Sequence, residues 1–119
     1  MKILIIEDEI LIQQSLKKLL TRRGCEVLTA SSGKEALALV LNQQFDRIVC
    51  DLMLQDITGF DIIEESKKIF DENQIKETFI IMTAYSSKQV LSKARDYGCL
   101  VLNKPFELEH ALEVITKKG

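Results

Sequence analysis

Five polar residues stand at the ends of short apolar runs in this sequence, and their side chains carry complementary chemistry. Three are carboxylates, one is a hydroxyl and one is an ammonium group: Glu7, Asp8, Asp51, Thr83 and Lys104. If the apolar runs form parallel strands, their carboxyl ends meet at one edge of a sheet, and these side chains share one crevice. Carboxylates about 4 Å apart repel by about 4 kcal/mol per pair at an effective dielectric of 20, so three of them leave about 12 kcal/mol uncompensated.

A divalent cation would neutralise this acidic crevice together with Lys104, because the two supply three positive charges against three carboxylates. The side-chain ligands would all be oxygens, which favours a hard cation. Mg²⁺ fits best, with Mn²⁺ as a substitute, since Mg²⁺ binds one or two carboxylates and keeps several waters. The residues therefore predict a magnesium site whose water positions can accept a phosphoryl oxygen.

The elements that must position these residues alternate strictly between strand and helix. Near-continuous apolar runs predict strands over residues 3–6, 25–30, 47–50, 78–82 and 100–102. Apolar residues at helical spacing predict helices over residues 12–23, 33–41, 60–70, 90–97 and 108–115. Gly24 and Gly98 are the expected stops of the first and fourth helices, and Ser32 with Glu35 matches the capping pattern of the second.

Five such βα units predict an α/β fold with one doubly wound parallel sheet. Near-continuous apolar runs are typical of strands that are covered by helices on both faces of the sheet. Right-handed crossovers then give a parallel sheet, and the flavodoxin-like strand order 2-1-3-4-5 is the expected arrangement. The 119 residues suffice for one domain, which we expect to span residues 1–119 with Met1 as the natural start.

Composition excludes several classes of protein. The net charge is −2 and the basic residues are scattered in pairs, which argues against nucleic-acid or membrane-surface binding by this domain. The three cysteines, Cys25, Cys50 and Cys99, have no metal-binding spacing and are typical of buried thiols in a reducing compartment. The apolar run 3–6 is too short for a signal peptide or a membrane span, so we expect a cytoplasmic protein.

The ordered motifs resemble the receiver domain of two-component response regulators along the whole chain. Four segments carry the resemblance: Glu7-Asp8 after the first strand, Asp51-Leu52-Met53-Leu54 followed by Gly59, Met82-Thr83-Ala84-Tyr85, and Lys104-Pro105-Phe106. The resemblance implies a signalling domain that catalyses only its own phosphorylation and dephosphorylation. It also implies a sensor histidine kinase or a histidine phosphotransfer protein as the partner.

Residue roles follow from the resemblance. Asp51 would accept a phosphoryl group from a phosphohistidine, and Asp8, Asp51 and the Met53 backbone carbonyl would bind Mg²⁺ directly. Glu7 would reach the metal through water. Lys104 would pair with Asp51 and then with the phosphoryl group.

Other positions bear on switching and on the lifetime of the phosphorylated state. The resemblance implies that Thr83 moves toward the phosphoryl oxygen, and the small Ala84 would leave the acceptor reachable. Val101 stands where the family usually has an aromatic switch residue, so Tyr85 is the nearest aromatic side chain that could respond. Met53 and Tyr85 flank the expected phosphoryl group with apolar surface, which predicts slow self-dephosphorylation.

Gln55 stands where the loop after Asp51 usually has Pro, which predicts a less rigid loop. The helix over residues 90–97, the strand 100–102 and the last helix form the family's usual signalling face. This face offers mixed charges for a symmetric dimer, with a solvated face on a monomer as the alternative.

Two other functions remain open from the residues. The altered region around Val101 is compatible with a receiver-like interaction module that works without phosphorylation. A Mg²⁺-dependent phosphohydrolase would also use an aspartyl phosphate, but such enzymes resembling haloacid dehalogenases need a second Asp two residues after the nucleophile. Met53 occupies that position.

Overall fold

Five short strands form one parallel sheet in the computed structural model, which describes residues 1–117. The strands are β1 (Lys2–Ile6), β2 (Glu26–Ala30), β3 (Arg47–Asp51), β4 (Phe79–Thr83) and β5 (Leu100–Asn103). Their order is β2-β1-β3-β4-β5, and every neighbouring pair is parallel. The predicted flavodoxin-like order is therefore confirmed. The predicted domain boundary at Gly119 lies outside the described residues.

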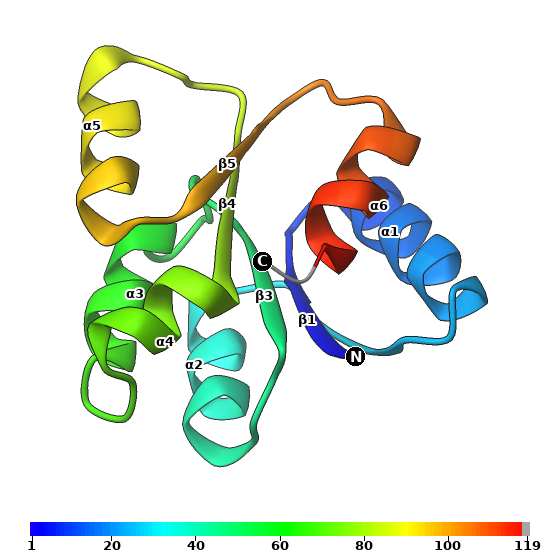
Figure 1. Cartoon of the computed structure of the whole chain (residues 1–119), viewed down its shortest axis with the longest axis horizontal. Coiled ribbons are helices and arrows are strands. Elements are labelled where there is room, and N and C mark those ends of the chain that lie inside the picture. The colour runs from blue at the N-terminus through cyan, green and yellow to red at the C-terminus, as the bar shows by residue number, and fades with distance from the viewer. Residues whose placement is uncertain (118–119) are drawn as a thin grey trace.

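Six helices cover the two faces of this sheet. They are α1 (Ile10–Arg22), α2 (Gly33–Asn42), α3 (Gly59–Ser66), α4 (Glu72–Thr78), α5 (Lys88–Tyr97) and α6 (Leu108–Thr116). Figure 1 shows α1 and α6 on one side of the sheet and the other four helices on the opposite side. Because successive strand residues face opposite sides, Ile3 and Ile5 of β1 join the core under α1 and α6. Leu4 and Ile6 join the core on the other face.

The connection between β3 and β4 differs from the prediction of one helix over residues 60–70. Two helices stand there, because α3 ends at Ser66 and Asp71 begins α4 by accepting a hydrogen bond from the Gln74 N–H at 2.8 Å. The Gln74 side chain in turn accepts a hydrogen bond from the Asp71 N–H, and the two bonds form a capping box. Phe70 consequently lies in the turn, edge-on against Phe79 with ring centroids 6.2 Å apart.

The remaining boundaries move by one or two residues. Thr78 belongs to the end of α4, so β4 begins at Phe79 rather than at residue 78. The stop of α5 is as predicted: Gly98 adopts a φ of 75°, a left-handed conformation that glycine enters without steric cost. Over the part of the chain that the structure describes, we find no helix with the length and apolar character needed to span a bilayer.

Candidate metal and phosphoryl site

Three carboxylates converge at the carboxyl ends of β1 and β3. Within residues 1–117, Glu7, Asp8 and Asp51 form a group whose carboxylate oxygens, one from each residue, lie within 4.8 Å of one another. The sheet register brings two of them together, because Ile6 of β1 pairs with Cys50 of β3 and each of these residues is followed by an acid. Glu7 is fully buried, Asp51 is 6% exposed and Asp8 is half-buried.

Lys104 enters the same site from the end of β5. Its Nζ forms an ion pair with Glu7 Oε1 and lies 3.3 Å from Asp51 Oδ2 and 3.9 Å from Glu9 Oε2. The Lys104 backbone N–H donates to the Thr83 carbonyl at 2.8 Å, which fixes where the lysine leaves the sheet. The side chain is only 13% exposed, so its charge acts on the carboxylates with little screening by water.

Burial and mutual repulsion make the cluster unusually receptive to cations. Burial of Glu7 and the nearby Asp51 raise the pKa of Glu7 to about 7, although the Lys104 hydrogen bond acts in the opposite direction. Burial lowers the pKa of Lys104, but the Glu7 and Asp51 carboxylates raise it by more, so this pKa lies above its ordinary value. Glu7 therefore titrates near neutral pH, where a bound cation would displace its proton.

The chemistry of the donor set fits Mg²⁺. Three carboxylates lie together at the edge of the sheet, and no histidine or cysteine belongs to the cluster. The loop after Asp51 turns back over this edge, because the Met53 N–H donates to Asp51 Oδ1 at 3.2 Å and Met53 bridges to Thr58. The Met53 side chain is 53% exposed.

Gly59 begins α3 directly against the end of β3. A Cβ atom built at this glycine would lie 3.0 Å from the Asp51 carbonyl oxygen and 3.2 Å from Cys50 Sγ. The Gly59 N–H also donates to the Leu52 carbonyl at 2.8 Å. A side chain at this position would press against the Asp51 and Leu52 backbone, so the glycine lets α3 begin this close to the end of β3.

Thr83 ends β4 with its hydroxyl engaged in its own loop. The Thr83 Oγ1 accepts from the Tyr85 N–H at 2.8 Å and donates to the Tyr85 carbonyl at 3.2 Å. Ala84 is exposed and Tyr85 is 65% exposed. Val101 pairs with Ile81 in the sheet and packs against the core under α2, α3 and α5. The threonine hydroxyl would have to leave the Tyr85 backbone to reach a phosphoryl oxygen.

Three polar residues near the site escape prediction from the sequence. Glu9 approaches Lys104, and Gln13 of α1 is buried, with its amide donating to the Glu7 carbonyl at 2.9 Å. Asp56 accepts hydrogen bonds from the start of α2. The signal for Glu9 was its place in the acidic run after β1, whereas Gln13 and Asp56 make contacts between segments distant in the sequence.

Comparison with known proteins decides the family. The family model for the response regulator receiver domain matches residues 3–116. This chain belongs to the response regulator receiver domain family. The predicted family and the predicted role as a phosphoacceptor domain of two-component signalling are therefore confirmed.

Curated relatives of this receiver domain differ in length. The chain is 28% identical to sporulation initiation phosphotransferase F of Bacillus subtilis, over 98% of this chain and 91% of that protein. It is 30% identical to the probable transcriptional regulator ycf29 of Pyropia yezoensis, over 96% of this chain. It is 32% identical to the transcriptional regulatory protein ZraR of Escherichia coli, over 97% of this chain. The chain spans about half of ycf29 (51%) and a quarter of ZraR (25%).

Solved structures agree with the fold of the receiver domain. A CheY-like receiver domain protein from Methanospirillum hungatei superposes with a TM-score of 0.85 at 29% identity, covering 96% of this chain and 89% of that one. The response regulator TrrA from Thermotoga maritima, in complex with Mg²⁺ and BeF, gives 0.80 at 27% identity, covering 99% and 98%.

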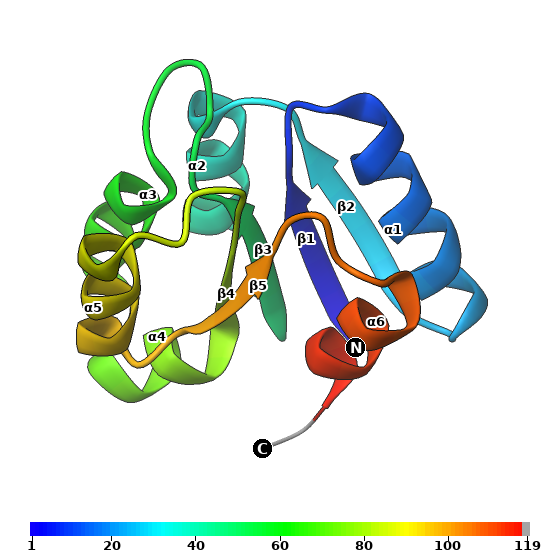
Figure 2. The same cartoon turned by 90° about the horizontal axis from the view of Figure 1, so that it is seen from above.

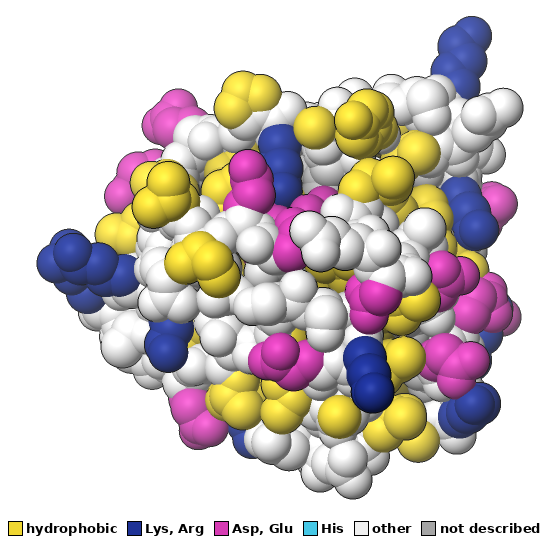
Figure 3. All heavy atoms as spheres, turned by 180° about the vertical axis from the view of Figure 1, so that it is seen from behind, with side chains coloured by type: hydrophobic (Ala, Val, Ile, Leu, Met, Phe, Trp, Pro, Cys, Tyr) yellow, Lys and Arg dark blue, Asp and Glu magenta, His cyan; other side chains and the backbone are white. Residues whose placement is uncertain are grey.

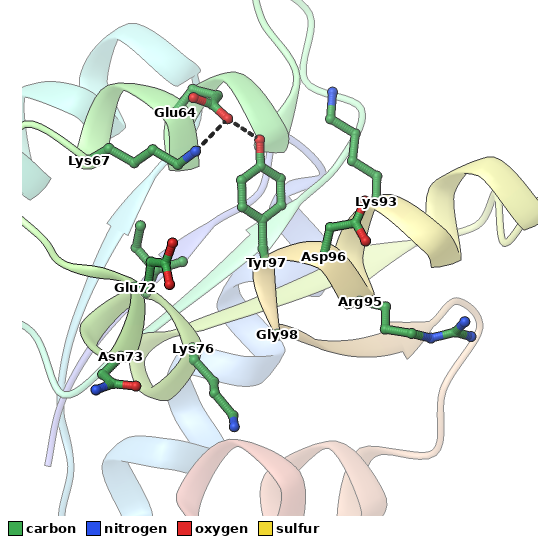
Figure 4. Close-up of a pocket in the computed structure, with 11 residues that line it drawn as sticks. Glu64, Lys67, Glu72, Asn73, Lys76, Lys93, Arg95, Asp96, Tyr97 and Gly98 are labelled. Atoms are coloured by element: carbon green, nitrogen blue, oxygen red, sulfur yellow. Dashed lines mark hydrogen bonds and ion pairs between the residues drawn. The ribbon is translucent and has the colours of Figure 1, made fainter.

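Outside the acidic cluster, charged residues of both signs are mixed on the surface of the receiver domain. On the face in Figure 3, lysines and arginines are dispersed among acidic and hydrophobic side chains. A hollow of about 490 Å³ lies between α3, α4 and α5, with both signs of charge around it (Figure 4). Tyr97 points across this hollow and donates to Glu64, which also pairs with Lys67 at 3.0 Å. None of its lining residues belongs to the acidic cluster.

Proposed function

We propose that Asp51 of this receiver domain accepts a phosphoryl group while Mg²⁺ is held by Glu7, Asp8 and Asp51. The observation that carries the proposal is the approach of these three carboxylates to within 4.8 Å, with the Lys104 ammonium 3.3 Å from Asp51. A bound Mg²⁺ would supply charge neutralisation and sites for phosphoryl oxygens. Mn²⁺, which also favours oxygen ligands, would substitute for it.

The proposed transfer moves one phosphoryl group between two residues. A carboxylate oxygen of Asp51 attacks phosphorus in a phosphohistidine, the P–N bond breaks, and imidazole leaves with the electron pair of that bond. The product is an acyl phosphate on Asp51. Lys104 would neutralise charge on the phosphoryl oxygens, and Thr83 would donate its hydroxyl to one of them after releasing the Tyr85 backbone. Hydrolysis later returns the carboxylate and inorganic phosphate.

The family implies a histidine kinase or a histidine phosphotransfer protein as the partner of this receiver domain. Exposed apolar side chains stand in two loops around the site and at the start of α1. Ile10 is 56% and Leu11 is 84% exposed, while Met53 and Tyr85 project from the loops that follow β3 and β4. We propose that these four residues contact the protein that carries the phosphohistidine, since apolar surface beside a polar centre favours a macromolecular donor.

A phosphodonor experiment tests the proposed function directly. Acetyl phosphate with Mg²⁺ should add the mass of one phosphoryl group to the chain, and Asp51→Asn should abolish this addition. Asp61→Asn is the matched control, because Asp61 caps α3 on the surface, away from the acidic cluster. A phosphoryl group retained in Asp51→Asn, or absent from the wild type, would contradict the proposal.

The face formed by α5, β5 and α6 carries mixed charges and the exposed Leu100, and we propose that phosphorylation promotes a symmetric dimer through it. Light scattering with and without beryllofluoride would reveal this change. We also propose a cytoplasmic location, which the three free thiols at Cys25, Cys50 and Cys99 support.

A further inference from the structure

Residues 31–34 lead from β2 into the first turn of α2, and this 31–34 turn lies between the two loops that carry the acidic cluster. Figure 2 shows this connection crossing the end of the sheet, with the loop after β1 on one side and the arched loop after β3 on the other. Asp56 in the loop after β3 accepts hydrogen bonds from this turn directly, and Gln13 of α1 bridges the turn to the Glu7 carbonyl in the loop after β1. The turn is therefore linked to both loops, to one through Gln13 and to the other through Asp56.

The first link runs through Gln13 of α1. Its Nε2 lies 2.9 Å from the Glu7 carbonyl, 3.1 Å from Ser31 Oγ and 3.4 Å from the Ala30 carbonyl. Gln13 is 3% exposed, and its hydrogen bonds to the Glu7 and Ala30 carbonyls are buried, whereas Ser31 is exposed. The amide consequently holds the backbone between Glu7 and Asp8 at a fixed distance from the 31–34 turn.

The second link runs through Asp56, in the loop after the phosphoacceptor. Its Oδ1 accepts from the Gly33 N–H at 2.9 Å and its Oδ2 accepts from the Lys34 N–H at 3.0 Å. These two bonds satisfy donors that the first turn of a helix leaves without an intrahelical partner, and the carboxylate is favoured at this end of the helix dipole. They also lower the pKa of Asp56 below its ordinary value, so the link persists as a charged one at neutral pH.

Packing at Gly33 reinforces the second link. The Ile57 side chain covers this glycine so closely that a Cβ atom there would lie 2.1 Å from Ile57 Cγ1. Ile57 in turn packs against the core under α2 and α3. The loop after Asp51 is therefore held against α2 by two charged hydrogen bonds and by one apolar contact.

We propose that the 31–34 turn sets the distance between the metal-binding loop and the phosphoacceptor loop, with Gln13 and Asp56 as positioning residues. The inference rests on the proposed function, because it concerns the same Mg²⁺ site. A cation that uses Glu7, Asp8 and Asp51 together binds more tightly when their loops are already held at the right separation. Neither positioning residue contacts the metal or the phosphoryl group.

The test measures Mg²⁺ affinity and phosphorylation rate for four forms of the full chain. These are the wild type, Asp56→Ala, Gln13→Met and the control Ser32→Ala. Ser32 caps the same helix by accepting from the Glu35 N–H at 3.2 Å, so its loss weakens α2 while leaving both links intact. Asp56 is exposed, so its variant decides the question even if the buried Gln13→Met substitution prevents folding.

We expect Asp56→Ala to weaken Mg²⁺ binding by about two- to tenfold, the range that one or two hydrogen bonds provide. The rate with acetyl phosphate should fall at low Mg²⁺ and recover toward the wild-type rate at saturating Mg²⁺, because bound metal restores the loop separation. Damage to the fold alone would lower the rate at every Mg²⁺ concentration. Ser32→Ala should lower the melting temperature without changing the Mg²⁺ affinity.

Two results would overturn the inference: Mg²⁺ binding by Asp56→Ala equal to that of the wild type, or equal weakening in Ser32→Ala and Asp56→Ala. Failure of the proposed function would be distinguishable from either result. In that case the wild type would bind Mg²⁺ yet take no phosphoryl group on Asp51, and the four Mg²⁺ affinities would still judge the role of the turn.

Discussion

Two glutamates of this receiver domain each pair with a lysine, and their pKa values move in opposite directions. Burial beside Asp51 raises the pKa of Glu7 to about 7, even though Lys104 contacts it. Hydrogen bonds from Tyr97 and Lys67 lower the pKa of Glu64, which stands at the hollow between α3, α4 and α5 (Figure 4). The side chain of Glu7 is 0% exposed, whereas that of Glu64 is 52% exposed.

The difference separates a buried cluster with an excess of negative charge from a surface cluster, formed by Glu64, Lys67 and Tyr97, that joins α3 to α5. At Glu64 the ions pair in water, and the Phe60 and Tyr97 rings stack with centroids 5.8 Å apart beneath them. At Glu7 an excess of negative charge is held away from water, which raises the free energy of the metal-free state. A bound cation would relieve that excess, which is the charge neutralisation that the proposed phosphoryl transfer requires.

The largest effect is expected from replacing Lys104, whose ammonium group contacts the acidic cluster. Lys104→Met should slow phosphorylation of Asp51 by acetyl phosphate about 100-fold, since loss of one preorganised electrostatic partner typically costs that much. Mass spectrometry over time at saturating Mg²⁺ would give the rate. Lys93→Met is the matched control, because Lys93 lies over the Phe60 ring at the surface cluster and should leave the rate within about twofold of the wild type. A phosphorylation rate of Lys104→Met within a few-fold of the wild-type rate would contradict the proposed electrostatic role of Lys104.

The second prediction concerns pH. Because Glu7 has a pKa of about 7, its proton must leave for Mg²⁺ to bind, and the affinity should rise about tenfold from pH 6 to pH 8. In the metal-free domain, Glu7 contributes stability that is fully present below its ordinary pKa of 4.5 and is lost as pH rises through about 7. Calorimetric titration with Mg²⁺ at several pH values would measure the slope. Glu7→Gln should flatten it, and an unchanged slope in that variant would show that another group is responsible.

The strand-end residues could be predicted from the sequence because parallel topology alone brings them together. Each of Glu7, Asp51, Thr83 and Lys104 ends a strand or directly follows one, and the sheet register completes the site without any detail of loop conformation. Because the site depends on strand topology, the sequence predicts the acidic cluster even though its prediction of one helix between β3 and β4 is wrong.

The remaining parts depend on interactions that apolar periodicity does not report. The separate helix α4 begins where Asp71 and Gln74 cap each other, beyond the predicted helix over residues 60–70, and apolar spacing does not report such a cap. Asp56 reaches α2 across 22 and 23 residues of sequence, so its role follows from the fold and not from a motif. Gln55 predicts a less rigid loop, which stays a prediction, and the structure shows that Asp56 links this segment to α2 while Met53 bridges to Thr58.

A smaller effect is expected at the exposed rim of the acidic cluster. Met53 offers no group to orient water toward an acyl phosphate on Asp51, and its side chain is already 53% exposed. Met53→Asn should therefore shorten the half-life of phosphorylated Asp51 several-fold, because a carboxamide can hold the attacking water. Loss of the phosphoryl mass after removal of the donor would measure this. Met53→Leu is the control and should keep the wild-type half-life, and Tyr85→Ala should shorten it by exposing the acyl phosphate to water.

The smallest effect is expected at the surface cluster between α3 and α5. Tyr97→Phe removes the hydroxyl that donates to Glu64 but keeps the ring stacked on Phe60, and Lys67 remains 3.0 Å from the same carboxylate. Since exposed charged contacts contribute little net stability, the urea midpoint and the phosphorylation rate should both stay close to the wild-type values. Glu64→Gln should behave alike, because the amide oxygen still accepts from Tyr97. A marked fall in phosphorylation without a change in the urea midpoint would mean that the contact between α3 and α5 acts on Asp51, and the two regions would then have to be treated as one coupled site.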